Sequence, residues 1–302
     1  MKRISTVAEM KAACRQITRA GKTLGFVPTM GALHDGHLSL VRASKARCNV
    51  TAVSLFVNPL QFGPTEDLHK YPRMLERDAA MLEQAGADFL FAPPVEEMYA
   101  GAEVNAQPNG PHLSAPSKQA PDHRSDTYVV VEGLSNKLDG ASRPGHFRGV
   151  ATVVAKLFEI VRPDCAFFGQ KDAAQVAVLR RMARDLDMDV EIVVCPIVRE
   201  KDGLAMSSRN AYLSPEQRQQ ALVLHRALLR VQMMADRGER DAKTLREIGK
   251  QVIAEEPGAR LDYFEFVDPD TLDPVEHVKA GALVAVAAYV GTTRLIDNIL
   301  LT

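Results

Sequence analysis

The chain has 302 residues, a length that favours two domains over a single core. Hydrophobic residues make up 46% of it, enough for a substantial buried core, and the formal net charge of -1 gives no global electrostatic case for binding nucleic acid or a membrane surface. The four cysteines are scattered without metal-finger spacing, the start lacks an apolar signal core, and the longest apolar run is too short to span a bilayer. We therefore expect a cytoplasmic protein with no nucleic-acid or membrane partner.

The first two hundred residues alternate between helical and strand patterns. Apolar spacing predicts helices over 7–20, 38–43, 72–86, 150–160 and 173–186. Runs rich in apolar and β-branched residues predict strands over 23–29, 50–57, 88–92, 127–131, 165–169 and 190–198. Alternating strands and helices with short links are typical of a parallel sheet covered by helices on both faces.

The composition changes twice along the chain. Between residues 100 and 126, Gly, Pro, Asn, Ser and Gln dominate, which predicts a long, mobile surface insertion. Beyond Arg199, helices are expected over 215–236 and 242–254, and strands over 263–267 and 283–287. We therefore predict an α/β nucleotide-binding domain over 1–199 and a smaller α+β domain over 200–302.

The most informative stretch is GFVPTMGALHDGHL, residues 25–38. An apolar run ends in a short loop bracketed by glycines, and His34 and His37 stand three apart where a helix should begin. Free N–H groups and the helix dipole at such a helix start favour a phosphate. A metal site is a weak alternative, because a third ligand is not evident nearby. A purely structural role, in which the pair caps and solvates the helix start, stays open.

Two later loops have the chemistry of a polyphosphate site. Residues 201–210 contain a glycine and two hydroxyls beside Arg209, whose planar fork can neutralise phosphate charge. Lys171 and Asp172 follow the predicted strand 165–169, and ligands of open parallel sheets bind at the carboxyl ends of strands. The alternatives are a solvated interdomain linker for the first loop and a surface ion pair for the second.

Two glutamines suit a small hydroxylated acid. Gln61 follows the predicted strand 50–57, and Gln175 lies one turn into the predicted helix 173–186. Their amides are uncharged donors and acceptors. Any single glutamine is more often a surface residue.

The motifs together resemble those of the pantothenate synthetase (pantoate–β-alanine ligase) family, in the H-x-G-H nucleotidyltransferase superfamily. The resemblance is carried, in the family's order, by PTMGALHDGH at 28–37, FVNPLQF at 56–62, RPGHF at 143–147, GQKD at 169–172 and MSSRN at 206–210. It covers nearly the whole chain. It implies a Rossmann-like parallel-sheet domain with a C-terminal lid domain.

The resemblance also implies an ATP-dependent ligase that condenses (R)-pantoate with β-alanine through pantoyl adenylate, releasing pyrophosphate and AMP. Its catalytic residues here are His37, His34, Lys171, Ser207, Ser208 and Arg209, with His37 the proton donor. Its ATP-binding residues are Met30, Gly31, Ala32, Leu33, His34, Asp35, Gly36, His37, Gly169, Gln170, Lys171, Asp172, Val198, Met206, Ser207, Ser208 and Arg209. Gln61, Gln175 and Asn58 are its substrate-binding residues.

The remaining expectations from the resemblance are Mg²⁺ bridging the phosphates of ATP, Asp78 as a candidate near that ion, and a homodimer. Gln170 departs from the family pattern, where many relatives carry an acidic residue, and the 100–126 insertion is longer than the usual link. The alternative is a nucleotidyltransferase of the same superfamily that acts on another small acid or a phosphate.

Overall fold

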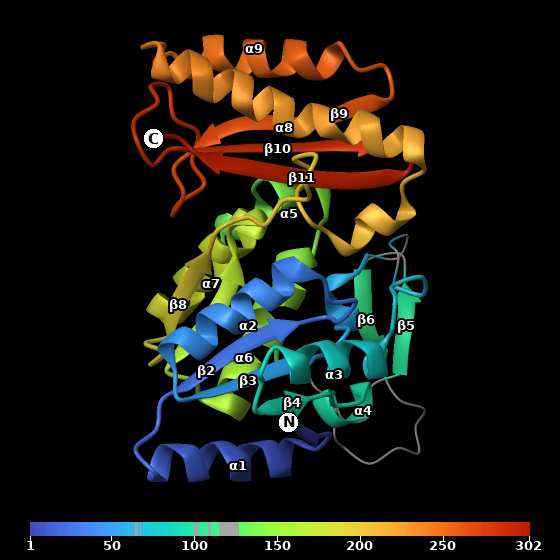
Figure 1. Ribbon diagram of the computed structural model, residues 1–302, viewed down its shortest axis with the longest axis vertical. Coiled ribbons are helices and arrows are strands. Elements are labelled where there is room, and N and C mark those ends of the chain that lie inside the picture. The colour runs from blue at the N-terminus through green and yellow to red at the C-terminus, as the bar shows by residue number, and fades with distance from the viewer. Residues whose placement is uncertain (64–65, 67, 100–102, 108–109, 115–126) are drawn as a thin grey trace. The chain divides into compact units, whose positions relative to one another are not determined.

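The computed structural model describes residues 1–63, 66, 68–99, 103–107, 110–114 and 127–302 (Figure 1). The chain divides into two compact units: Met1–Phe168 with Val178–Cys195, and Gly169–Ala177 with Pro196–Thr302. The sequence predicted a division near residue 199, and the second unit also takes the short segment that carries Lys171 and Gln175. That the two parts are independent domains stays a prediction.

The first unit contains a six-stranded sheet of order β1-β4-β3-β2-β7-β8. The pairs β1–β4, β4–β3, β3–β2 and β2–β7 all run parallel, as the alternating pattern predicts. The strands are β1 (Lys2–Ile4), β2 (Leu24–Thr29), β3 (Val50–Leu55), β4 (Phe89–Phe91), β7 (Cys165–Gly169) and β8 (Glu191–Cys195). The predicted parallel α/β class is confirmed.

Helices pack on this sheet through their apolar side chains. The main helices are α1 (Val7–Arg19), α2 (Asp35–Arg47), α3 (Leu75–Gln84), α6 (His146–Val161) and α7 (Ala173–Asp185), with short α4 (Val95–Met98) and α5 (Asp139–Ser142). Helices α2 and α3 share a core with the sheet that includes Val27, Val53, Leu40 and Leu82. Among the residues described, no helix combines the length and apolar character that a membrane crossing requires.

One expectation for the middle of the chain was wrong, and the predicted insertion contains a feature that its composition did not indicate. No strand forms over 127–131: Val130 is exposed, and the N–H of Val129 donates to the Thr152 hydroxyl instead of to a neighbouring strand. Conversely, the predicted insertion contains an antiparallel hairpin of β5 (Glu103–Gln107) and β6 (Gly110–Ser114). The rest of the 100–126 stretch, with its predicted mobility, lies outside the described residues.

The second unit is a small α+β layer structure. Its antiparallel sheet has the order β11-β10-β9, formed by β9 (Ala259–Val267), β10 (Leu283–Val290) and β11 (Thr293–Leu300). Helices α8 (Pro215–Asp236) and α9 (Ala242–Ala254) pack on it (Figure 1). Pro215 occupies the first turn of α8 as predicted, and Ser214 and Gln217 form a capping box there. The α+β class of this part is confirmed.

Candidate active site

The link between β2 and α2 holds His34 and His37 side by side. The backbone of Gly31 and Ala32 turns through the left-handed region, with φ of 85° and 51°, and α2 then begins at Asp35. Because His34 is the N-cap and His37 lies one turn on, their ring centroids are only 4.1 Å apart. The structure therefore presents two imidazoles together at a helix N-terminus.

The backbone fixes the protonation pattern of His37. Its Nδ1 accepts the N–H of His34 at 3.3 Å. In a neutral imidazole, the nitrogen that accepts carries no proton, so the proton of His37 resides on Nε2. His37 thus offers an N–H donor on the side of the ring away from its own helix start.

Asp78, in the first turns of α3, holds this link in place. Its Oδ2 accepts the N–H of Ala32 at 2.8 Å and its Oδ1 accepts the N–H of Leu33 at 3.0 Å. Only 1% of the residue is exposed. Both carboxylate oxygens are therefore occupied by the loop that leads to the histidines.

The predicted substrate residues Asn58 and Gln61 share one tight turn after β3. The Gln61 amide lies between Met30, whose sulfur it contacts at 2.7 Å, and the Asn58 amide at 3.2 Å. Asn58 is 1% exposed and also contacts the Tyr99 hydroxyl and the Gly149 carbonyl. Its contacts make Asn58 a support for Gln61.

The RPGHF motif braces the same turn from the start of α6. The Gln61 carbonyl lies 2.8 Å from Nδ1 of His146, and Arg143 makes a two-pronged ion pair with Glu66 at 2.7 and 2.6 Å. Burial tends to raise the pKa of Glu66, but the hydrogen bonds and charge of Arg143 outweigh it and lower that pKa overall. The sequence alone indicated no role for this motif. In the structure it contacts the backbone of the turn that carries Gln61.

In the second unit, a buried strand residue supports the Gln170–Asp172 turn. The Asn298 amide, in β11, donates to the carbonyls of Gln170 and Lys171 at 3.0 and 2.9 Å and accepts from the Gln170 side chain at 3.1 Å. Lys171 pairs weakly with Asp172, at 3.4 Å. The backbone of Lys171 is thus held by Asn298, while its ammonium group makes a long ion pair with Asp172.

The second predicted loop is a short hairpin that is closed by backbone hydrogen bonds and joined to β11 by an ion pair. The N–H of Met206 donates to the Val198 carbonyl at 3.0 Å, which brings two predicted ATP-binding positions together. Arg199 makes a two-pronged bond to the buried Asp297 at 2.6 and 2.9 Å. Ser207 then caps the short helical turn Ser208–Tyr212 by accepting the Arg209 N–H. The loop that carries Ser207, Ser208 and Arg209 is therefore held by hydrogen bonds of its own backbone and by an ion pair to β11.

The predicted site residues fall into two groups, one in each unit. His34, His37, Met30, Gln61 and Asn58 belong to the first. Lys171, Gln175, Val198 and Met206–Arg209 belong to the second. Sequence reasoning missed the supports Tyr99, Gly149, Asp297 and Asn298, and the available signal was the adjacent polar pair Asp297-Asn298 within the strand β11.

Two other chemistries find no support in the described part of the chain. All four cysteines are buried, and burial raises the pKa of Cys14 to about 12 and that of Cys48 to about 11, so neither is a ready nucleophile. The described residues also contain no group of three or more His, Cys, Asp or Glu that could hold a metal ion.

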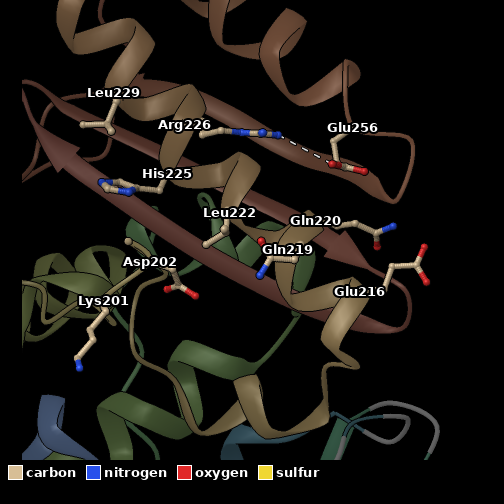
Figure 2. Close-up of a pocket in the computed structure, with 11 residues that line it drawn as sticks. Lys201, Asp202, Glu216, Gln219, Gln220, Leu222, His225, Arg226, Leu229 and Glu256 are labelled. Atoms are coloured by element: carbon tan, nitrogen blue, oxygen red, sulfur yellow. Dashed lines mark ion pairs between the residues drawn. The ribbon is translucent and has the colours of Figure 1, made fainter.

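A surface pocket of about 590 Å³ lies along α8 in the second unit (Figure 2). Acidic, basic and amide side chains mix along it, among them Lys201, Asp202, Gln219, Arg226 and Glu256. Arg226 and Glu256 approach to 3.9 Å. None of the 11 lining residues is a predicted site residue, and the pocket has no single charge preference.

Comparison with known proteins supplies the context for this geometry. The sequence model described as pantoate-beta-alanine ligase matches residues 2–300. A pantothenate synthetase of Koribacter versatilis is 60% identical over all of this chain and 96% of its own length. One from Acidobacterium capsulatum is 58% identical over all of this chain and 97% of its own length.

Solved structures agree. The crystal structure of pantothenate synthetase from Thermus thermophilus superimposes with a TM-score of 0.88 at 48% identity, covering 99% of both chains. That of pantoate-beta-alanine ligase from Francisella tularensis, complexed with beta-gamma ATP and beta-alanine, gives a TM-score of 0.75 at 30% identity over 99% of this chain and 97% of the other. On this evidence the chain belongs to the pantoate–β-alanine ligase family.

Proposed function

We propose that the protein condenses (R)-pantoate with β-alanine at the expense of ATP, which it cleaves to AMP and pyrophosphate. The observation that carries this proposal is the pair of imidazoles of His34 and His37 at the start of α2, in a chain that matches the ligase family over residues 2–300. The relative from Francisella tularensis, solved with beta-gamma ATP and beta-alanine, supports the choice of substrates.

The reaction has two steps. A carboxylate oxygen of pantoate attacks the α-phosphorus of ATP, the bond to the bridging oxygen breaks, and pyrophosphate leaves. The neutral amine of β-alanine then attacks the acyl carbon of pantoyl adenylate, AMP leaves with the bridging oxygen, and the amine loses a proton. The first step builds charge on the leaving pyrophosphate and needs positioned donors more than covalent help.

The first unit supplies two kinds of group for the adenylation step. His37, with its proton on Nε2, donates to the phosphate oxygens beside His34, and the free N–H groups of α2 add to the attraction. One well-placed donor is worth about 3 kcal/mol in such a transition state. The Gln61 amide, held by Asn58, Met30 and the carbonyl brace of His146, hydrogen-bonds pantoate.

In the proposal, residues of the second unit bind the polyphosphate of ATP. Lys171 and Arg209 neutralise charge, and the hydroxyls of Ser207 and Ser208 donate hydrogen bonds. The contacts described above favour this role, because Asn298 accepts and donates at the Gln170–Lys171 turn and the Arg199–Asp297 pair holds the hairpin before Ser207 against β11. Gln175 completes the pantoate contacts of the proposal.

Magnesium enters the proposal as a companion of ATP. The described residues do not fit a protein-built magnesium cage, because no suitable ligand cluster is present among them and both oxygens of Asp78 accept backbone N–H groups. The ion would neutralise phosphate charge while bound to the nucleotide's own oxygens. The steps above therefore use only groups of this chain.

The proposal also includes a cytoplasmic location and a homodimer.

The test is a coupled assay for AMP and pyrophosphate with ATP and (R)-pantoate, run with and without β-alanine. We expect sustained AMP release only when β-alanine is present, and pantothenate formed in equal amount. Pyrophosphate release without any β-alanine-dependent AMP would instead indicate a nucleotidyltransferase that stops at the adenylate, and would overturn the ligase proposal.

A further inference from the structure

The loop between β2 and α2 has a backbone that does not hold itself in place. Ala32 adopts a φ of 51°, in the left-handed region that is unfavourable for a residue with a Cβ. Such a conformation persists only where its surroundings enforce it. The stretch that leads directly into His34 therefore needs an external support.

Asp78 is that support. Its carboxylate is 1% exposed and binds the N–H of Ala32 and the N–H of Leu33 through separate oxygens, at 2.8 and 3.0 Å. Gly31 brings the loop close enough that a Cβ there would lie 3.1 Å from Oδ2. A buried carboxylate is costly unless its oxygens are satisfied, so the two N–H groups and the carboxylate stabilise each other.

We propose that Asp78 is a positioning residue, whose buried carboxylate fixes the 31–33 backbone and thereby aims His34 and His37 at the phosphates, and that it does not act through magnesium. The kinetic test of this inference rests on the proposed function. The magnesium role suggested for Asp78 by family resemblance requires an oxygen directed at a hydrated ion. Both oxygens here accept backbone N–H groups, and the residue is 1% exposed.

The decisive variant is Asp78→Asn, which keeps the size but leaves one oxygen for two N–H donors. The matched control is Asp164→Asn, because Asp164 accepts the Leu24 N–H at 2.6 Å at the opposite end of the same strand, β2. Both variants lose a bond from a carboxylate to the backbone. Only the first loses it beside the histidines.

We expect Asp78→Asn to lower kcat about 100-fold, the scale set by small misplacements of catalytic groups, with KM for β-alanine within about twofold of that of the parent protein. The Mg²⁺ concentration for half-maximal rate should not change. Asp164→Asn should keep its kcat. A kcat unchanged in Asp78→Asn, or restored by excess Mg²⁺, overturns the proposal.

A second readout does not depend on turnover. Nitrogen-15 NMR of the histidine rings in the full-length protein reports whether the His37 proton is on Nε2, as its bond to His34 requires. We expect a single Nε2–H form in the parent protein and in Asp164→Asn, and a mixture of tautomers in Asp78→Asn. Unchanged ring signals in Asp78→Asn contradict the positioning role even if the parent protein proves not to be a ligase.

Asp78→Glu provides a further test should Asp78→Asn not fold. It keeps the charge and the affinity of a carboxylate for a metal, but moves both oxygens by one methylene. The positioning role predicts a loss of kcat as in Asp78→Asn and altered ring signals. A role through magnesium predicts near-normal kcat, and that result overturns the proposal.

Discussion

At the scale of single residues, the site is built by backbone groups that dictate what the side chains can do. The His34 N–H is accepted by Nδ1 of His37, so the ring presents its Nε2 as an N–H donor. The donor is then ready where charge develops on the leaving pyrophosphate, with no reorganisation needed at that moment. The task of His37 follows from its tautomer.

We predict that His37→Ala lowers kcat for AMP formation by about 100-fold or more while the far-ultraviolet circular dichroism spectrum is unchanged, because a half-buried surface imidazole contributes little to the core. His277→Ala, at an exposed position, is the control and should keep full activity. Turnover like that of the parent protein in His37→Ala would remove this residue from the mechanism.

The residues that face a ligand were easier to predict than the residues that hold them. His34 and His37 are close in sequence, so their spacing alone predicts that the two rings meet. Asn298 supports Lys171 across 127 positions of the chain, and no local pattern encodes such a contact. Asp78 was singled out by resemblance for magnesium, and its two backbone partners became visible only when α3 was packed beside the loop.

At the scale of elements, the turn that holds Gln61 depends on a close approach by helix α6. A Cβ on Gly149 would lie 2.2 Å from the Leu60 carbonyl oxygen and 2.6 Å from the Gln61 nitrogen. Because both atoms belong to the backbone, the clash cannot be relieved by a change of side-chain rotamer. Only glycine lets α6 lie against this turn.

Gly149→Ala should therefore displace the Gln61 turn. We predict a loss of about 1–3 kcal/mol in the free energy of unfolding and at least about a 10-fold fall in kcat/KM for pantoate. Gly249→Ala is the matched control. Gly249 lies in α9 of the other unit, and a Cβ there would lie 2.4 Å from the Phe264 ring. It should lose stability in urea titrations and keep its KM for pantoate. Equal kinetic losses in both variants would show that instability alone is responsible.

Helices and strands with a clear sequence pattern were predictable. Elements that depend on contacts with distant parts of the chain were not. The β-branched run of β3 and the Pro215 start of α8 agree with expectation. The apolar run 127–131 has the composition of a strand, yet the Val129 N–H goes to the Thr152 side chain. The short edge strand β1 carries too few residues to show a period and is defined by its pairing with β4.

At the scale of the whole molecule, two units with separate cores share one chain, and the second contains a histidine that couples its stability to pH. In the second unit, burial lowers the pKa of His225 from its ordinary value of 6.5, the positive charge of Arg199 lowers it further, and Asp297 partly opposes both. The unfolded chain then binds a proton at a pH where the folded chain does not. The stability that neutral His225 contributes is therefore fully present above about pH 6.5 and is lost as the pH falls through the lowered pKa.

We predict that the free energy of unfolding falls between about pH 7 and pH 5, and that His225→Gln makes this slope shallower. His277→Gln is the control at an exposed position. Urea titrations across the pH range, followed by circular dichroism, provide the measurement. A His225→Gln protein with the slope of the parent protein would exclude His225 as a source of the pH dependence.

The central claim is that pantoate is activated as an adenylate, and the fate of its carboxylate oxygen tests this most directly. Pantoate labelled with oxygen-18 in the carboxylate is converted with ATP and β-alanine, and the products are analysed by mass spectrometry. Attack at the α-phosphorus predicts one labelled oxygen in each AMP and none in pyrophosphate. Label in inorganic phosphate or pyrophosphate, with unlabelled AMP, would contradict the account.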